Sequence, residues 1–417
     1  MSVFRPFKAW RPKPEEAGLV ASKPYDVLNS DEAREEVKDH PLSFLHVGKP
    51  EVDLDPSIDL YSPEVYQKGK ENLQKLIDEG HLIEDKAESF YVYAQTMNGK
   101  IQYGLVGCAS VDDYWNDIIK KHEKTRASKE EDRCNHVRVT NAHSGPIFLT
   151  YPDNAEIDAI VADITKNAPE NDHIAADGIR HQSWVITDPA VNTKIQEIFA
   201  SIPALYIADG HHRSASAGRV GRERQQANPN HNGTEEYNYF LAVSFPASQL
   251  YIMDYNRVVK DLNGHTKDEF FEFLKKNFTI TQSPCCNSCA YHPKAKGEFG
   301  MYIDHTWYKL ETKPALLNNP DPVEVLDVAI LQREVLAPYL GIDDPRTSNR
   351  IDFVGGIRGL GELERRVDSG EMEVAFAMFA TSVNELISIA DAGQIMPPKS
   401  TWFEPKLRDG LFVHFLD

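Results

Sequence analysis

The sequence predicts a mixed α/β protein, of the α+β kind, and three observations support this class. Apolar runs of strand length alternate irregularly with amphipathic segments of helix length. The dipeptides Asn98-Gly99 and Asp304-His305 each separate two strand-like runs, as expected for hairpins. The apolar run 204–208 leads through Gly210 into a helical segment, so at least one strand feeds directly into a helix.

Capping and turn residues set the bounds of the elements expected in the first half. Ser30 or Asp31 caps a helix that reaches about residue 39, and Pro63 opens a helix that Gly80 ends. The remaining pattern predicts strands at 42–47, 90–95, 101–110 and 147–151, and helices at 112–123 and 155–167.

The second half repeats this mixture. A helical segment over 322–340 should end or kink at Pro338. The glycine-rich stretch 355–361 loosely resembles a dinucleotide-binding loop, but its spacing is wrong and a tight turn is the simpler interpretation. The pattern predicts strands at 237–246, 250–259, 300–303, 306–310 and 374–379, and helices at 267–277, from about 360, and at 382–392.

The length of 417 residues predicts two or three domains. We expect an N-terminal α/β region at 1–235 and a second α+β region at 236–395. We expect the basic, proline-rich segment 396–417 to fold back to the candidate site at 209–213 in the first region. The stretch 225–236, rich in Asn, Gln and Gly, is the expected linker or variable loop.

Composition excludes several classes of function. The chain has 45 Lys and Arg against 64 Asp and Glu, a net charge of −19, which repels a nucleic-acid backbone. Five unevenly spaced cysteines do not form a disulfide framework and suit a reducing compartment. The absence of a long apolar run predicts no membrane span. We therefore expect a cytoplasmic protein that binds neither nucleic acid nor membrane.

The segment ADGHHR (208–213) is the strongest candidate for a binding site. Gly210 can take the backbone angles that a strand-to-helix turn needs, and the helix behind it presents free N–H groups. His211, His212 and Arg213 stand beside those groups, which is the arrangement of a phosphate site. The alternative is an ordinary helix start with exposed histidines.

Residues 396–406 form a second candidate. Two prolines stiffen the backbone before Lys399, Ser400 and Thr401, and Lys406 adds another cation. This composition suits a phosphate or carboxylate ligand, although a solvated surface loop is the alternative.

Two more segments carry polar side chains that could reach a site. Asp177-Gly178 predicts a hairpin, from whose second strand Arg180 and His181 could contact substrate. His122-Glu123 is either a polar helix end or a general base with its orienting partner. It is not a zinc-protease motif, because position 126 is Arg126.

Three crowded cysteines offer a possible metal site. Zinc could bind Cys285, Cys286 and Cys289 with His292, but no second pair of cysteines follows. A variable surface loop is therefore the preferred interpretation, and the sequence assigns no metal ligand with this spacing.

The chain resembles a large family of uncharacterised, mostly prokaryotic proteins catalogued as a domain of unknown function and sometimes labelled ParB-like. The motifs are spread along almost the whole chain in family order: KPYDV (23–27), SFLHV (43–47), HEKT (122–125) with DR (132–133), GPIF (145–148), DGIRHQSW (177–184), ADGHHR (208–213) and MPPKSTWFEPK (396–406). The family has no settled activity.

The strand–DGHHR–helix segment is also similar to the phosphate-binding box of the ParB/sulfiredoxin-like group, which includes CTP-binding ParB proteins, sulfiredoxin and free-serine kinases. Gly210 and Arg213 match the box, whereas Ser216 stands where the group has Ala. The resemblance implies a ParB/sulfiredoxin-like nucleotide pocket with an additional α+β portion.

This similarity implies a nucleotide-dependent phosphotransferase acting on a small, hydroxyl-bearing or anionic molecule with the assistance of Mg²⁺. Residues 210–213 would hold phosphate, 399–401 would close over it, and Arg180, His181 and Lys406 would contact substrate. Asp209, Asp26 or Glu123 would be the base or a metal ligand. The choice among them stays open, as do the nucleotide (ATP, ADP or CTP), the acceptor and the oligomeric state. A nucleotide-binding regulatory protein and a small-molecule phosphohydrolase are the alternatives.

We predict no specific binding of duplex DNA at physiological salt, because non-specific affinity requires several Lys or Arg contacts to phosphates. The adjacent cations Arg365-Arg366 are flanked by Glu362, Glu364 and Asp368. Fluorescence anisotropy with a random duplex at about 0.15 M salt tests this. Submicromolar binding that weakens with added salt would contradict the prediction.

Overall fold

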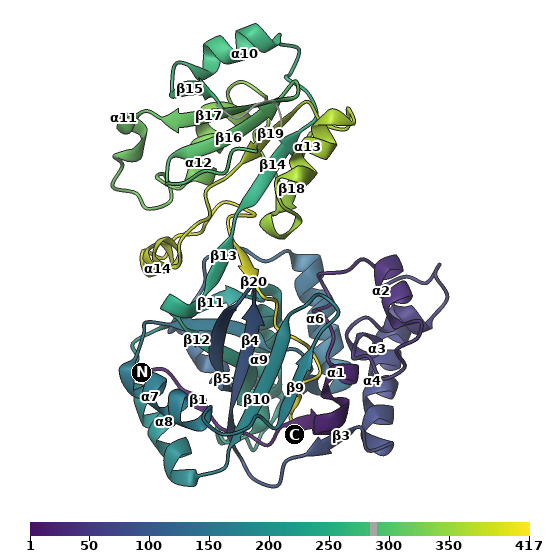
Figure 1. Cartoon of the computed structure of the whole chain (residues 1–417). Coiled ribbons are helices and arrows are strands. Elements are labelled where there is room, and N and C mark those ends of the chain that lie inside the picture. The colour runs from purple at the N-terminus through teal and green to yellow at the C-terminus, as the bar shows by residue number, and fades with distance from the viewer. Residues whose placement is uncertain (284–289) are drawn as a thin grey trace. The chain divides into compact units, whose positions relative to one another are not determined.

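The computed structural model describes residues 1–283 and 290–417 (Figure 1). The chain divides into two compact units, unit 1 (Met1–Leu250 with Pro405–Asp417) and unit 2 (Tyr251–Glu404). The last residues of the chain therefore belong to the same unit as the first 250. The cysteine cluster Cys285, Cys286 and Cys289 lies outside the described residues.

A mixed sheet forms the centre of unit 1 (Figure 1). Its strand order in the described residues is β6-β11-β8-β12-β5-β4-β10-β9, with β1 also paired to β5. The β8–β12 and β11–β6 pairs are parallel, and the other pairs are antiparallel. The strands are β1 (Phe4–Arg5), β4 (Phe90–Met97), β5 (Lys100–Ser110), β6 (Ile119–Lys120), β8 (Ile147–Tyr151), β9 (Asn171–Ile174), β10 (Arg180–Ile186), β11 (Leu205–Asp209) and β12 (Tyr239–Pro246).

Helices and two small ribbons complete unit 1. The ribbons pair β2 (Trp10–Pro12) with β3 (Leu82–Glu84), and β7 (Ala142–His143) with β21 (His414–Phe415). The α-helices are α1 (Ala17–Val20), α2 (Ser30–Val37), α3 (Leu45–Gly48), α4 (Pro63–Asp78), α5 (Val111–Trp115), α6 (Ala127–Thr140), α7 (Ala155–Ile164), α8 (Pro189–Ser201) and α9 (His211–Ala227). Short 3₁₀ turns are η1 (Pro14–Glu16), η2 (Pro50–Asp53), η3 (Glu236–Asn238) and η4 (Ala247–Gln249).

The apolar core of unit 1 holds the strand that leads to the candidate site. Leu205 and Ile207 of β11 are fully buried with Leu149 of β8 and Phe240 of β12. Because β11 and β8 are both anchored by this core, the start of α9 is held next to the residues that precede β8.

Unit 2 is built on an antiparallel sheet with the order β15-β17-β16-β19-β14-β18 in its described residues. The strands are β13 (Tyr251–Met253), β14 (Tyr255–Val259), β15 (Phe278–Gln282), β16 (Glu298–Ile303), β17 (Thr306–Thr312), β18 (Ile351–Gly355), β19 (Val374–Ala377) and β20 (Trp402–Glu404). The helices are α10 (Lys267–Leu274), α11 (Pro314–Leu317), α12 (Asp327–Leu331), the π-helical η5 (Gln332–Leu336), η6 (Gly356–Arg358), α13 (Gly361–Asp368) and α14 (Val383–Asp391).

The mixed α/β class is confirmed, and so are the predicted turns. Asn98-Gly99 joins β4 to β5, and Asp304-His305 joins β16 to β17. All four turn residues have positive φ, which the tight hairpin turn requires.

Two predicted elements are wrong, and tertiary packing explains both. Residues 42–47 form no strand: Phe44 and Val47 face a small core made with α4, and the chain coils there into α3. The helix over 112–123 ends at Trp115, because Asp117 turns left-handed and 119–120 pair with β11. The helical segment predicted over 322–340 is shorter than expected: it consists of α12 continued by η5, and it ends before Pro338.

In the part of the chain that the structure describes, no helix is long and apolar enough to cross a membrane.

Candidate functional site

The strand-to-helix turn at Gly210 has the geometry that the sequence predicts. Gly210 takes a left-handed conformation (φ 89°, ψ 34°) between β11 and α9, and no side chain caps the helix in the described structure. The backbone N–H of Ser214 donates to the Gly210 carbonyl (2.9 Å). The N–H groups of 211–213 therefore stand at the open end of a 17-residue helix, where the helix dipole favours an anion.

Asp209 holds the backbone in place where β11 leads into this turn. One carboxylate oxygen accepts the Gly210 N–H (2.8 Å), and the other lies 2.7 Å from the Lys406 ammonium. Burial raises the pKa of Asp209, but the Lys406 charge and the hydrogen bonds outweigh it and hold that pKa below its usual range. Lys406 thus lies at the turn, 197 residues away in sequence.

The two histidines of the turn face residues 122–126. The His211 ring packs edge-on against His122 (4.4 Å between centroids), and its Nδ1 lies 3.9 Å from the Glu123 carboxylate. The His212 Nε2 accepts the backbone N–H of Arg126 (3.0 Å). In a neutral His212 ring the hydrogen therefore sits on Nδ1.

Arg213 forms a two-point ion pair with Asp409. Its Nη1 and Nη2 lie 2.7 and 2.9 Å from the two carboxylate oxygens, and its guanidinium stands over the Tyr25 ring (5.3 Å). The side chains are 14% and 4% exposed, so the pair is largely shielded from water. Burial raises the pKa of Asp409, and Arg213 opposes that rise.

Gly145 makes room for this ion pair. A Cβ at position 145 would lie 1.7 Å from Arg213 Nη1 and 2.4 Å from Asp409 Oδ1. The glycine of the GPIF motif is therefore required by a close approach of side chains rather than by an unusual φ.

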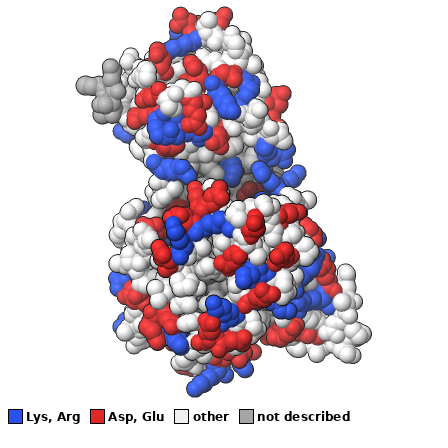
Figure 2. Space-filling view, turned by 90° about the vertical axis from the view of Figure 1, so that its right-hand side faces the viewer, with Lys and Arg blue, Asp and Glu red and all other residues white. Residues whose placement is uncertain are grey.

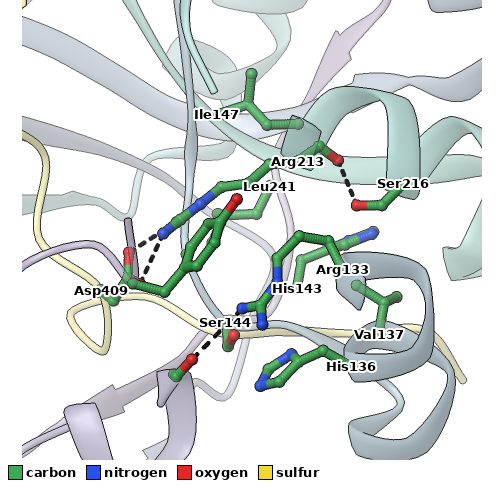
Figure 3. Close-up of a pocket in the computed structure, with 13 residues that line it drawn as sticks. Arg133, His136, Val137, His143, Ser144, Ile147, Arg213, Ser216, Leu241 and Asp409 are labelled. Atoms are coloured by element: carbon green, nitrogen blue, oxygen red, sulfur yellow. Dashed lines mark hydrogen bonds and ion pairs between the residues drawn. The ribbon is translucent and has the colours of Figure 1, made fainter. Parts of the chain in front are cut away.

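A small cavity of about 30 Å³ adjoins Arg213 (Figure 3). That volume accommodates about two water-sized groups, which is the end of a ligand rather than a whole nucleotide. Arg133 of α6 also stands over the Tyr25 ring (4.0 Å) and pairs with Asp132 (2.9 Å). The lining residues are Tyr25, Gly48, Arg133, His136, Val137, His143, Ser144, Gly145, Ile147, Arg213, Ser216, Leu241 and Asp409.

The three carboxylates predicted as the base or a metal ligand differ in their exposure and in their partners. Asp209 is engaged by Lys406, as described above. Asp26 is exposed, and its charge acts on Arg213, Asp409 and His212. The Glu123 side chain is 44% exposed beside His211. Asp26 and Glu123 are therefore the two of these carboxylates that a ligand can reach without breaking the Lys406 pair.

Arg180 and His181 point to opposite faces of β10, as neighbours on a strand must. The Arg180 side chain is 47% exposed and pairs with Asp172. His181 is fully buried, with Nδ1 2.7 Å from the Tyr93 hydroxyl and Nε2 accepting Arg408 Nε (3.2 Å). Burial lowers the pKa of His181 to about 2, so this ring is neutral.

Lys399, Ser400 and Thr401 belong to unit 2. The Lys399 ammonium stands over the Tyr255 ring (5.4 Å), and the Ser400 hydroxyl donates to the Pro397 carbonyl (2.6 Å). Their predicted closure over a phosphate stays a prediction.

One group of side chains near the turn has the composition of a metal site. The ligand atoms of His122, Glu123 and His211 all lie within 4.8 Å of one another. Two imidazoles and a carboxylate suit Zn²⁺ or Mn²⁺ better than Mg²⁺, which prefers oxygen ligands. For the predicted Mg²⁺, only the Glu123 carboxylate of this group fits, together with oxygens that a bound phosphate would bring.

The sequence singled out the turn but missed most of the cavity. Arg133, Tyr25 and Gly145 lie within quoted motifs, and Asp409 follows directly after Arg408. No local pattern identified Asp409 as the partner of Arg213. On the face drawn in Figure 2, basic side chains lie among acidic ones.

Comparison with known proteins places the chain in a family. The family described as "Protein of unknown function (DUF1015)" matches residues 4–329, and the chain belongs to it. No curated protein matches the chain.

Several solved structures are similar at low identity. A conserved hypothetical protein from Pyrococcus furiosus is 15% identical, with a TM-score of 0.34 over 76% of this chain and 97% of that one. A free serine kinase in complex with AMP is 15% identical (TM-score 0.35, 75% and 92%). SbnI with a C-terminal truncation, from Staphylococcus aureus, is 12% identical (TM-score 0.40, 74% and 87%).

We predict that Gly145→Ala destabilises the protein by about 1–3 kcal/mol, because the added methyl group must displace Arg213 or Asp409. Urea unfolding measures the change. The matched control is Gly361→Ala, where a Cβ meets nothing within 4 Å. Equal stability of the two variants would contradict the described packing.

A second prediction concerns pH. Burial lowers the pKa of His136 to about 4, and its Nε2 donates to the Val47 carbonyl (2.8 Å). Unfolded histidine titrates near pH 6.5, so the unfolded state binds more protons between about pH 6.5 and 4, and acidification destabilises the fold there.

The share of His136 in this loss is on the order of 3 kcal/mol. His136→Gln keeps a donor for Val47 and should flatten the stability profile between these pH values. The control is His305→Gln, on a side chain that is 72% exposed. Profiles of unchanged slope in both variants would contradict a neutral, buried His136.

Proposed function

We propose that this protein is a nucleotide-dependent phosphotransferase that acts on a small hydroxyl-bearing molecule. The observation that carries the proposal is the uncapped start of α9 behind a left-handed Gly210, with cationic side chains around it. Backbone N–H groups at a helix start bind phosphate oxygens without requiring any net positive charge on the protein. This matters in a chain with a net charge of −19.

Each polar group at the turn has a proposed role. Phosphate oxygens accept hydrogen bonds from the backbone N–H groups of 211–213. Arg213 and Lys406 supply positive charge, and Asp409 and Asp209 hold these side chains in place before the ligand arrives. Preorganised charge of this kind stabilises the transition state of phosphoryl transfer.

Glu123 is the proposed proton acceptor. Its half-exposed carboxylate lies beside His211 at the open end of α9, where an acceptor hydroxyl would approach a bound phosphate. Mg²⁺, when bound among the nucleotide phosphates, would neutralise charge that develops during transfer.

The test is incubation of the protein with ATP, ADP or CTP and Mg²⁺ in the presence of small hydroxyl compounds, followed by mass spectrometry. A nucleoside diphosphate with a phosphorylated acceptor supports the proposal. Binding without product indicates a regulatory protein, and free phosphate alone indicates a phosphohydrolase; either result contradicts it.

Two variants test the roles proposed for Arg213 and Glu123. Arg213→Lys keeps the charge but loses the two-point geometry, and should weaken nucleotide binding at least about tenfold. Glu123→Gln should leave binding intact and lower turnover about 10²–10⁴-fold. The control Arg365→Lys changes a 57% exposed pair in unit 2 and should alter neither. Full turnover in Glu123→Gln would remove this residue from the mechanism.

A further inference from the structure

A hydrogen-bond chain of two histidines and a carboxylate ends at the cavity beside Arg213. His143 of β7 and His414 of β21 stand directly opposite each other in an antiparallel pair, although 271 residues separate them. Their Nδ1 atoms are 3.3 Å apart, and the rings are 5.5 Å apart and only 18° from coplanar. An imidazole N–H lies in the plane of its ring, so this edge-to-edge arrangement suits an N–H···N hydrogen bond.

Glu236 fixes the direction in which the hydrogen bonds of this His143–His414–Glu236 chain are donated. Its carboxylate lies 2.8 Å from His414 Nε2 and is also bound by Arg5. Burial raises the pKa of Glu236, but His414 and Arg5 together bring it down to about 2. The carboxylate is therefore ionised and can only accept, so the hydrogen between them belongs to His414 Nε2.

The tautomer of His143 follows from that of His414. Burial lowers the pKa of His414, which keeps the ring neutral and leaves its Nδ1 with a lone pair. His143 must then donate from its own Nδ1, and its Nε2 carries the second lone pair.

This second lone pair is buried without a partner. His143 is 7% exposed and lines the cavity, and its Nε2 has no hydrogen-bond partner among the described residues. A buried acceptor left unpaired is unfavourable, so a donor from a ligand would be held strongly there.

The other residues that line the cavity limit which donor group could bind to His143 Nε2. Arg133, Arg213 and Asp409 line the same space, so two cations face one carboxylate there. This excess of positive charge disfavours an ammonium and favours a neutral donor attached to an anionic group. The volume of about 30 Å³ admits only such a small end group.

We propose that this cavity is a binding subsite for the hydroxyl group of a small hydroxy acid, which donates to His143 Nε2 while its carboxylate lies near Arg133. Calling that molecule the acceptor substrate rests on the proposed phosphotransfer; the subsite itself requires only the cavity and the His143–His414–Glu236 chain. His143 here is a binding residue, and His414 and Glu236 are positioning residues that set its tautomer.

The test compares glycolate with methoxyacetate, which carries the same carboxylate but cannot donate from its ether oxygen. Nuclear magnetic resonance of the full chain labelled with ¹⁵N-histidine follows binding and reports directly whether Nε2 carries hydrogen. His143→Gln identifies the signal of His143. We expect an unprotonated Nε2 in the free protein and a preference for glycolate of at least about tenfold.

His414→Phe is the decisive variant, because it changes no residue of the cavity. Glu236→Gln is unsuitable, because Glu236 Oε2 accepts from both Arg5 and His414 and a glutamine oxygen there would keep both bonds. Phenylalanine accepts no hydrogen bond, so His143 Nδ1 loses the acceptor that fixes its tautomer. His143 Nε2 can then carry the hydrogen, and the preference for glycolate over methoxyacetate should fall at least about tenfold.

Any of three results would overturn the subsite: a protonated Nε2 in the unmodified protein, no discrimination between the two acids, or an unchanged ratio in a folded His414→Phe protein. The nucleotide assay above is independent of both acids. Nucleotide turnover without glycolate binding rejects the subsite alone, and glycolate binding without turnover rejects the proposed function alone.

Discussion

The buried ion pair between Arg213 and Asp409 is the interaction on which the site depends. It joins the start of α9 to the last residues of the chain, and Gly145 is a glycine because the pair occupies the space of its side chain. Removing one partner of a buried pair leaves an uncompensated charge, which typically costs about 3–5 kcal/mol. The pair therefore forces the C-terminal segment, the turn before β8 and α9 to assemble together.

The other charges around the turn are balanced in the same way. Lys406 is matched by Asp209, and Arg133 by Asp132. A site with this internal balance does not need the positive surface that a chain of net charge −19 cannot provide. Its affinity for an anion would come from oriented N–H groups and from cations held in fixed positions, which stabilise charge without reorganising during a reaction.

Four buried histidines of unit 1 act as neutral hydrogen-bonding groups. Burial lowers the pKa of His136, His143, His181 and His211, so each ring has one donor and one acceptor nitrogen, assigned by its neighbours. In the pair formed by His143 and His414 that assignment begins at Glu236 and ends in the cavity. Backbone pairing of β7 with β21 thus decides which kind of ligand group the cavity accepts.

The sequence by itself determined the features that depend only on neighbouring residues. Asn98-Gly99 and Asp304-His305 specify hairpins, and Gly210 specifies the turn into α9, because left-handed φ is local and favours few residue types. Only the tertiary structure decided the rest. Packing produced α3 (Leu45–Gly48) where the local pattern predicted a strand over 42–47. Which of 64 acids pairs with Arg213, and which histidine faces His143, depends on tertiary contacts between residues 196 and 271 positions apart, and no local pattern encodes that choice.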